Sequence, residues 1–171
     1  MVDLSAAEFS AALLAFRVIF GFVFALHGWG KVKGGIGGTA GWFDSMGMKP
    51  GKLHAWAAAI TEMGTGVMIM LGLLTPFAAA GMVGMMVVAG WTVHRNNGFM
   101  IVKDGWEYTF IVACTAIFIA WLGPGEYSLD HALGFAESLN GWTGLLIADL
   151  LGGAAGIATL AIFYRPPSAE S

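Results

Sequence analysis

Two charged residues lie in apolar stretches that are long enough to cross a bilayer. Arg17 falls between Ser10 and about Gly30, and Glu62 falls between about Leu53 and Leu74. A charge at the centre of a membrane helix costs about 2.5–3.5 kcal/mol on insertion scales, so such residues face a partner or a wet cavity. Helix rise places the two Cα atoms within several ångströms in depth. We therefore predict an Arg17–Glu62 ion pair, in which Arg17 sets the charge and position of Glu62.

Further ionisable side chains gather at the inner ends of the predicted helices. His27 lies near the end of the first helix, His94 at the end of the third and Glu107 in the first turn of the fourth. Stripes of small and aromatic residues accompany these groups, which suits a pocket for a flat, apolar ligand. A membrane quinone fits because His and carboxylate groups can exchange the protons that accompany its reduction. The predicted catalytic residues are Glu62, His27 and Glu107, and the predicted ligand-binding residues are Arg17, His94, Trp106, Tyr108 and Phe24.

The same side chains leave other interpretations open. Two histidines and two carboxylates are adequate metal ligands, although no His-x-x-x-His or Glu-x-x-His pair lies on one helix. His27 and His94 also offer a bis-His haem site, and intramembrane charges are compatible with a proton relay or a small-solute transporter. Taken singly, His27 and His54 fit simple hydrogen bonding at the interface. We predict quinone as the ligand, and no flavin, haem or metal.

The composition is typical of an integral membrane protein. The chain has 171 residues, of which 57% are hydrophobic and 11% charged, and its mean hydropathy is +0.74. Soluble domains average about 45–50% apolar and about 25% charged residues. The net charge of −3 gives no footprint for nucleic acid, and the one cysteine, Cys114, excludes an internal disulfide. We expect one domain that lies mostly in the bilayer.

Five segments meet the length of about 20 residues that a membrane-crossing helix needs. They are Ser10 to about Gly30, about Leu53 to Leu74, Pro76 to about His94, Trp106 to Leu122 and Gly141 to Tyr164. The very short turn at Thr75-Pro76 makes the second and third helices antiparallel neighbours. The sequence thus predicts an all-α membrane bundle.

The connections differ in character. The glycine-rich stretch from Lys31 to Lys52 is predicted to be a flexible connection, with Trp42 and Phe43 suited to the membrane interface. Ser128 is predicted to cap a short surface helix from about Leu129 to Leu139. Seven of the eight Lys and Arg residues fall on one face of a five-pass chain, the exception being Arg17. The positive-inside rule makes this face cytoplasmic, with the N-terminus outside and the C-terminus inside.

Short motifs follow one another in a characteristic order over roughly residues 10–135. They are Arg17, His27-Gly28-Trp29-Gly30-Lys31, Glu62-Met63-Gly64, Leu71-Gly72-Leu73-Leu74-Thr75-Pro76, His94 with Gly98-Phe99, Gly105-Trp106-Glu107-Tyr108 and Gly123-Pro124-Gly125-Glu126-Tyr127-Ser128-Leu129-Asp130. In order and spacing this set resembles the DoxX family of small bacterial membrane proteins. One departure is Asp104, which stands where a second glycine is expected before the aromatic-Glu-Tyr run.

The resemblance implies a four-helix transmembrane bundle over residues 10–135 and an additional transmembrane helix over 141–164, in the bacterial cytoplasmic membrane. DoxX-like proteins are associated with membrane oxidoreductase complexes, and related DoxD proteins resemble quinone-linked thiosulfate oxidation subunits. The resemblance therefore implies a quinone-binding subunit of a redox or respiratory complex. The alternative is a non-catalytic scaffold or accessory subunit in which Arg17–Glu62 is structural. Partner subunits are expected to dock on the fifth helix through Gly152, Gly153 and Gly156.

Overall fold

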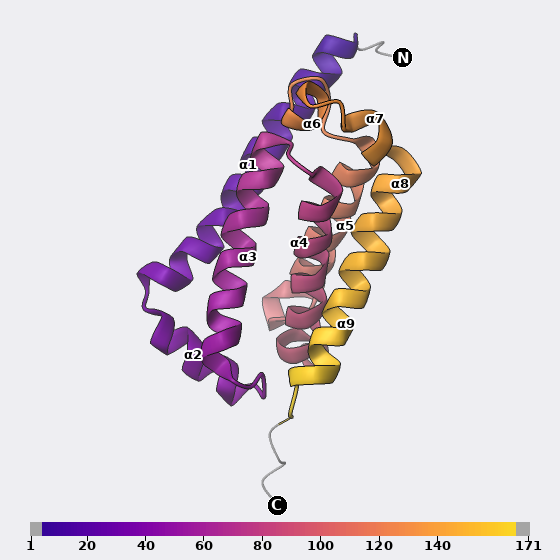
Figure 1. Cartoon of the computed structure of the whole chain (residues 1–171). Helices are drawn as coiled ribbons and strands as arrows, with labels where there is room; N and C mark the ends of the chain where they lie inside the picture. The colour runs from indigo at the N-terminus through magenta and orange to yellow at the C-terminus, as the bar shows by residue number, and fades with distance from the viewer. Residues whose placement is uncertain (1–4, 167–171) are drawn as a thin grey trace, which may run out of the picture.

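Long apolar runs in a bilayer fold as helices, because only a helix satisfies its own backbone groups without water. The computed structural model describes residues 5–166, in which the main elements are five helical segments, here called passes without regard to a membrane (Figure 1). The passes are α1 (Ala6–Lys33), α3 (Gly51–Leu71), α4 (Thr75–Ala89), α5 (Glu107–Leu122), and α8 (Gly141–Leu146) continued through the π-helix η4 (Ile147–Leu151) into α9 (Gly152–Phe163). This arrangement confirms the predicted all-α fold.

Helices α1 and α3 form a close antiparallel pair. Ser5 caps the start of α1. Its side chain accepts a hydrogen bond from the Glu8 backbone N–H, and the Glu8 carboxylate accepts one from the Ser5 backbone N–H. Glycines let the two helices approach: a Cβ on Gly28 would lie 2.6 Å from the Ala59 carbonyl oxygen. Gly21 is opposite Gly66 in the same way. The contact points fix the relative depth of every side chain on the two helices.

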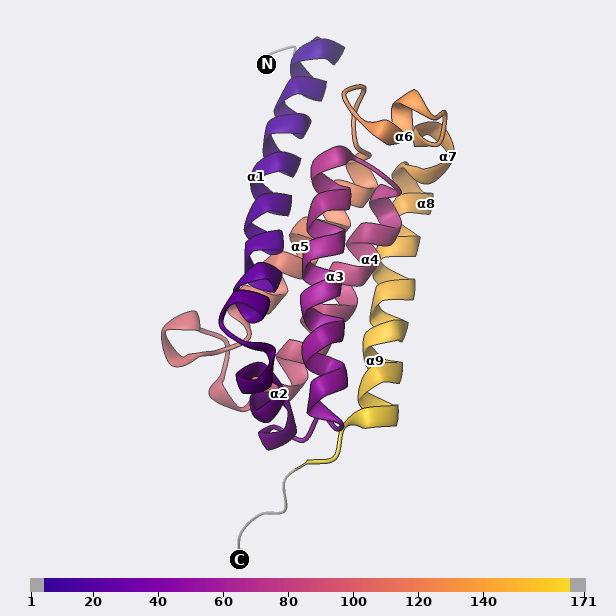
Figure 2. The ribbon, with the colours of Figure 1, turned by 60° about the vertical axis from the view of Figure 1, so that its left-hand side comes forward.

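Helices α4, α5 and α9 make the other side of the bundle (Figures 1 and 2). The predicted tight turn is confirmed, since α3 ends at Leu71 and α4 begins at Thr75, with Gly72 in the left-handed region at φ +61°. The apolar core between the two sides includes Ile69, Met82 and Ile119, none of them more than 1% exposed.

The fifth pass packs on α4 through its glycines. A Cβ on Gly152 would lie 2.6 Å from the Ala80 carbonyl oxygen, and one on Gly156 would lie 2.7 Å from Val87 Cβ. These two glycines are therefore buried inside the molecule, and the prediction that they form a docking surface for partners is wrong. Gly153 has open space around it.

The stretch after α1 is ordered as a helix. Instead of the predicted flexible connection, α2 (Ile36–Ser45) lies beside the start of α3. Phe43 is buried while Trp42 is 49% exposed. The Asp44 side chain accepts a hydrogen bond of 2.8 Å from the Gly51 backbone N–H at the start of α3. Burial of one face therefore overcomes the low helix propensity of the glycines.

A short backbone clasp joins the end of α9 to the loop before α3. Met48 and Tyr164 form an isolated antiparallel bridge, and the Arg165 N–H donates to the Gly47 carbonyl at 2.7 Å. The predicted surface helix near residue 130 is split in two, α6 (Leu129–Ala132) and α7 (Ala136–Leu139), at Gly134 with φ +75°. The predicted Ser128 cap is confirmed by a 3.2 Å bond from the His131 N–H.

The surface of the bundle is that of a membrane protein. Ile19 is 65% exposed, Ile60 64% and Ile157 63%, which is unfavourable in water but suited to lipid. Within residues 5–166, three helical stretches are long and apolar enough to cross a membrane. They are Ala6–Lys33, Thr75–Asn97 and Gly141–Phe163, with α5 as a shorter apolar helix. The stretch Thr75–Asn97 is α4 extended by the π-helix η1 (Gly90–His94) and the 3-10 turn η2 (Arg95–Asn97).

Candidate functional site

Arg17 is completely buried, but it does not meet Glu62. Its guanidinium donates to the carbonyls of Ile69 at 3.1 Å and Met70 at 3.2 Å, in the last turn of α3, and to the carbonyl of Tyr127 at 2.7 Å. Carbonyls at the end of a helix lack partners within the helix, and here the arginine supplies them. The predicted Arg17–Glu62 ion pair is therefore wrong.

The reason is the register of the antiparallel pair α1–α3. Gly21 lies against Gly66 and Met70, and Gly28 lies against Ala59 and Met63. Glu62 is thus level with residues near 27 on α1, about ten residues or about 15 Å along the axis from Arg17. The two charges belong to two separate sites.

Asp130 completes the site around Arg17. It is fully buried, and its carboxylate accepts hydrogen bonds from the Leu74 N–H at 2.7 Å and from the N–H and hydroxyl of Thr75 at 2.9 and 2.7 Å. These groups open α4, so the negative carboxylate lies at the positive end of the helix dipole. We call Arg17, Asp130 and these backbone partners the Arg17–Asp130 cluster. Nothing in the local sequence predicts the burial of Asp130, because the neighbouring acidic residues Glu126 and Glu137 are exposed.

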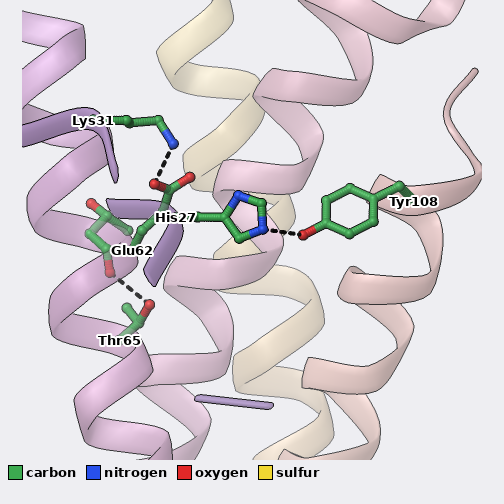
Figure 3. Close-up of polar contacts among 6 residues, drawn as sticks. His27, Lys31, Glu62, Thr65 and Tyr108 are labelled. Atoms are coloured by element: carbon green, nitrogen blue, oxygen red, sulfur yellow. Dashed lines mark hydrogen bonds and ion pairs between the residues drawn. The ribbon is translucent and has the colours of Figure 1, made fainter. Parts of the chain in front are cut away.

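Glu62 pairs with Lys31, a residue that the sequence analysis did not assign to the site. The Lys31 ammonium donates to Glu62 Oε2 at 2.5 Å, and the two side chains are 22% and 8% exposed (Figure 3). Lys31 lies one helical turn after His27, so both can reach the same region beside Glu62. The signals in the sequence are its spacing of four from His27 and its place in the His27-Gly28-Trp29-Gly30-Lys31 motif.

His27 reaches across to the other side of the bundle. Its Nε2 lies 3.3 Å from the Tyr108 hydroxyl, within hydrogen-bond distance (Figure 3). His27 comes from α1 and Tyr108 from the first turn of α5, two helices that pack mainly on different neighbours. This contact therefore bridges the two sides of the molecule.

His94 ends the π-helix η1, and a wide π turn re-aims side chains relative to an ordinary helix. Its Nδ1 lies 2.6 Å from the Asp104 carbonyl oxygen. Because a carbonyl only accepts, Nδ1 carries the hydrogen and Nε2 of the neutral ring is left as an acceptor. Asp104 has φ +56°, in the left-handed region that favours glycine. This conformation explains the glycine expected at that position.

A cavity of about 210 Å³ lies where these groups meet, and we call it the polar cavity. It is lined by His27, Lys31, Trp42, Phe43, Met46, Ala58, Glu62, Met85, Met86, Val88, Ala89, Thr92, Val93, His94, Tyr108 and Thr109. An ammonium, a phenol, two imidazoles and a carboxylate thus share one space with apolar and aromatic walls. Such a set can donate hydrogen bonds to a ligand oxygen, accept them, and transfer protons.

Four of the predicted site residues line the polar cavity: Glu62, His27, His94 and Tyr108. The other predicted residues lie elsewhere. Glu107 accepts a 2.8 Å bond from the Ile101 N–H and holds the loop before α5. Trp106 stacks edge-on with Phe99 and lines a separate hollow between α4 and α5, and Phe24 is 3% exposed in the apolar core. The structure therefore keeps the predicted pocket but removes half of its members.

Two histidines and two carboxylates were the possible metal ligands in the sequence, and the structure shows how they lie. Across residues 5–166, no three His, Cys, Asp or Glu side chains come together in a way that could hold a metal ion. His94 is anchored to the Asp104 carbonyl, and Glu62 to Lys31. A metal site made of the two histidines and two carboxylates is therefore not formed.

Comparisons with known proteins agree with this fold. A model of the family described as DoxX matches residues 12–95. The chain is 30% identical over 123 residues to "Putative oxidoreductase CatD" of Bacillus subtilis, covering 72% of this chain and 87% of that protein. It is 29% identical over 126 residues to "Inner membrane protein YqjF" of Escherichia coli, with 71% and 91% covered.

A third relative is "Uncharacterized membrane protein Rv3486" of Mycobacterium tuberculosis, 28% identical over 137 residues, with 74% of this chain and 84% of that protein covered. No solved structure gives a significant match. The relatives are matched over most of their length, and the family model covers α1, α3 and α4 with the turns between them. The motif order, the helical bundle and these matches together show that the chain belongs to the DoxX family.

Proposed function

We propose that this chain is the membrane subunit of a redox complex and that the polar cavity binds the ring of a quinone. The observation that carries the proposal is the convergence of Lys31, Glu62, His27, His94 and Tyr108 on one cavity with apolar walls. A quinone has a flat, apolar ring with two oxygens. The apolar walls suit the ring, and the polar side chains suit the oxygens. A relative from Bacillus subtilis that carries the word oxidoreductase in its name gives further support.

Each polar group has a role in this proposal. The Lys31 ammonium and the Tyr108 hydroxyl donate hydrogen bonds to the ring oxygens, and the His94 Nε2 accepts one from the reduced form. Reduction of the quinone to the quinol takes two electrons and two protons. His27 and Glu62 would take up protons from the cytoplasmic side and pass them to the ring oxygens, and a partner subunit with a redox centre would supply the electrons.

The orientation follows from the charges. Lys33 ends α1, Lys49 and Lys52 lie at the start of α3, and Arg165 follows α9. These three helix ends lie at the same end of the bundle (Figure 1). By the positive-inside rule this end faces the cytoplasm of the bacterial cell. The polar cavity would then take its protons from the cytoplasmic side, with the N-terminus outside.

The test is quinone binding by the full chain in lipid nanodiscs. A short-tailed ubiquinone or menaquinone with a photoreactive group is titrated, and labelled peptides are mapped by mass spectrometry. Glu62→Gln is expected to weaken saturable labelling of the cavity about tenfold or more, while Glu126→Gln, an exposed carboxylate at the other end, leaves it unchanged. Equal labelling of a folded Glu62→Gln protein would overturn the proposal.

The alternative is a non-catalytic scaffold or accessory subunit. The observation that favours it is the Lys31–Glu62 ion pair, which joins α1 to α3 and so also has a structural role. The structural ion pair is thus Lys31–Glu62 and not the predicted Arg17–Glu62. Under this alternative, the wild-type protein shows no saturable quinone labelling and Glu62→Gln lowers the recovery of the assembled complex.

A further inference from the structure

A second cavity opens between α3, α4 and α9, and we call it the lateral cleft. Its volume is about 360 Å³, within the range of about 300–1,000 Å³ that ligand pockets usually have. Phe43, Ala58, Met85 and Val88 line both the lateral cleft and the polar cavity. The two spaces are therefore neighbours, but their other lining residues differ, and the described lining of the lateral cleft contains none of the charged groups of the polar cavity.

The lateral cleft has the length of a hydrocarbon chain. On α4 its lining extends from Phe77 to Val88, which is about 16 Å along the helix axis. On the fifth pass it extends from Leu151, the last residue of η4, to Thr159 of α9, about 12 Å. Gly81 on α4 removes side-chain volume along its course, since a Cβ there would lie 2.8 Å from the Thr65 methyl group. The cleft is therefore elongated and apolar.

His54, which lines the lateral cleft, has a buried ring nitrogen without a partner in the described part of the chain. His54, in the first turn of α3, is 7% exposed, and its Nε2 makes no hydrogen bond with any group in residues 5–166. The ring is held edge-on to Phe163, with centroids 4.9 Å apart, and also contacts Phe43. A buried polar atom without a partner costs about 1–3 kcal/mol, so the site favours a ligand that supplies one.

The lining also sets the charge of that ligand. Among the residues that the structure describes, no Asp, Glu, Lys or Arg lines the lateral cleft. A charged headgroup would lie there without a counter-ion, which is strongly unfavourable. A hydroxyl both donates and accepts, so it can bond to His54 Nε2 in either tautomer of the ring.

We propose that the lateral cleft binds a single-chain lipid with an uncharged hydroxyl headgroup. The hydroxyl bonds to His54 Nε2 near the basic end of the bundle, and the chain lies between α3, α4 and α9. Both a free long-chain alcohol and a monoacylglycerol have this chemistry. The proposal does not depend on quinone binding in the polar cavity.

The experiment is photolabelling of the full chain in nanodiscs with hexadecanol that carries a diazirine in its chain. Saturable labels are expected on the segment from Leu151 at the end of η4 to Thr159 of α9, and on the facing part of α4. Unlabelled hexadecanol and monopalmitoylglycerol are the competitors that separate the two sources, and competition by either supports the proposal. Competition by hexadecane or palmitate as strong as that by hexadecanol, or by a short-tailed ubiquinone, would overturn it.

Two pairs of variants test the site itself. His54→Phe keeps an aromatic ring but removes the polar atom, and is expected to lower labelling about tenfold, whereas His131→Phe, on an exposed histidine of α6, leaves it unchanged. Ala155→Phe fills the exposed mouth of the cleft and is expected to have the same effect, and its neighbour Ala154→Phe serves as control. Labelling that does not saturate, or that is equal in Ala155→Phe and Ala154→Phe, contradicts the proposal.

Glu62→Gln separates this proposal from the proposed function. Glu62 lines the polar cavity and not the lateral cleft, so hexadecanol labelling is expected to be unchanged in that variant while quinone labelling falls. Loss of both labels in a folded Glu62→Gln protein would show that the two spaces are one site, which contradicts the separate lipid site.

Discussion

The Arg17–Asp130 cluster and the polar cavity both contain charged groups inside the bundle, but they bind different kinds of partner. In the cluster, Arg17 donates only to backbone carbonyls, and Asp130 accepts from the backbone and one hydroxyl at the start of α4. In the polar cavity, Lys31, Glu62 and His27 pair with other side chains. Backbone partners at helix ends are fixed by the fold, whereas side-chain partners can exchange with a ligand.

The comparison shows that a charge inside a membrane helix does not by itself mark a functional site. Its partners decide the matter: the cluster joins the end of α3 to the start of α4 and to the segment before α6 through backbone groups. The polar cavity has both exchangeable partners and free space. Four predictions test this distinction.

The largest effect is expected for Arg17→Leu. It removes three hydrogen bonds from a charged donor, each worth about 1.5–3 kcal/mol, and leaves buried carbonyls without partners. We expect a loss of several kcal/mol of stability and little folded protein in detergent, measured by thermal unfolding and size-exclusion chromatography. Lys33→Leu, an exposed basic residue at the end of the same helix, is the control. A wild-type unfolding temperature for Arg17→Leu would place Arg17 outside the structural cluster.

Asp130→Asn is expected to have the next largest effect. The amide keeps the shape but loses the charge and one acceptor at the start of α4, which should cost about 1.5–3 kcal/mol. The loss should appear as a lower unfolding temperature, with quinone labelling of the remaining folded protein unchanged. Reduced labelling in folded Asp130→Asn would break the separation between the two sites.

Replacement of Lys31 and Glu62 should affect stability less and binding more. The pair is partly exposed, so Lys31→Met and Glu62→Gln should each cost about 1 kcal/mol of stability. A double-mutant cycle on unfolding and on quinone binding measures the coupling in each. We expect the coupling free energy between Lys31 and Glu62 to be larger for quinone binding than for unfolding. Coupling confined to the unfolding free energy would make the pair structural, like the Arg17–Asp130 cluster.

The smallest effect is expected for Tyr108→Phe. It removes one hydroxyl in the polar cavity, so quinone affinity should fall by the worth of one hydrogen bond, about 0.5–1.5 kcal/mol, with stability nearly unchanged. Tyr127→Phe is the matched control, because Arg17 bonds the Tyr127 carbonyl and not its side chain. Equal affinities of the two variants would remove Tyr108 from the binding site.

The sequence predicted much of the fold because the signals were local. The apolar runs, the short turn at Thr75-Pro76 and the Ser128 cap each depend on a few neighbouring residues, and the structure confirms them. The order of the motifs resembled the DoxX family, which the comparisons show. Helix α2 was missed because its glycines disfavour helix, and only burial against α3 offsets that preference.

The site was predicted in outline but not in its pairings. Residues at the same end of several helices converge, which placed His27, Glu62 and His94 together. The partner of Glu62 depends on the register of α1 against α3, and this is set by the contacts of Gly21 and Gly28. Other glycines of the same two helices, such as Gly30 and Gly64, have open space beside them instead of a close contact. The sequence alone therefore could not show which glycines set the register.

The clasp between Met48 and Tyr164 sets an order of events during synthesis. Helices α1 and α3 are complete once residue 71 has left the ribosome, and they can pair early. The clasp needs residue 164, so the loop before α3 waits for nearly the whole chain before it is tied to the end of α9. Until then the lateral cleft has no third wall and is open to the bilayer. The proposed lipid would therefore meet the cleft in this open form, and the last helix would then enclose it.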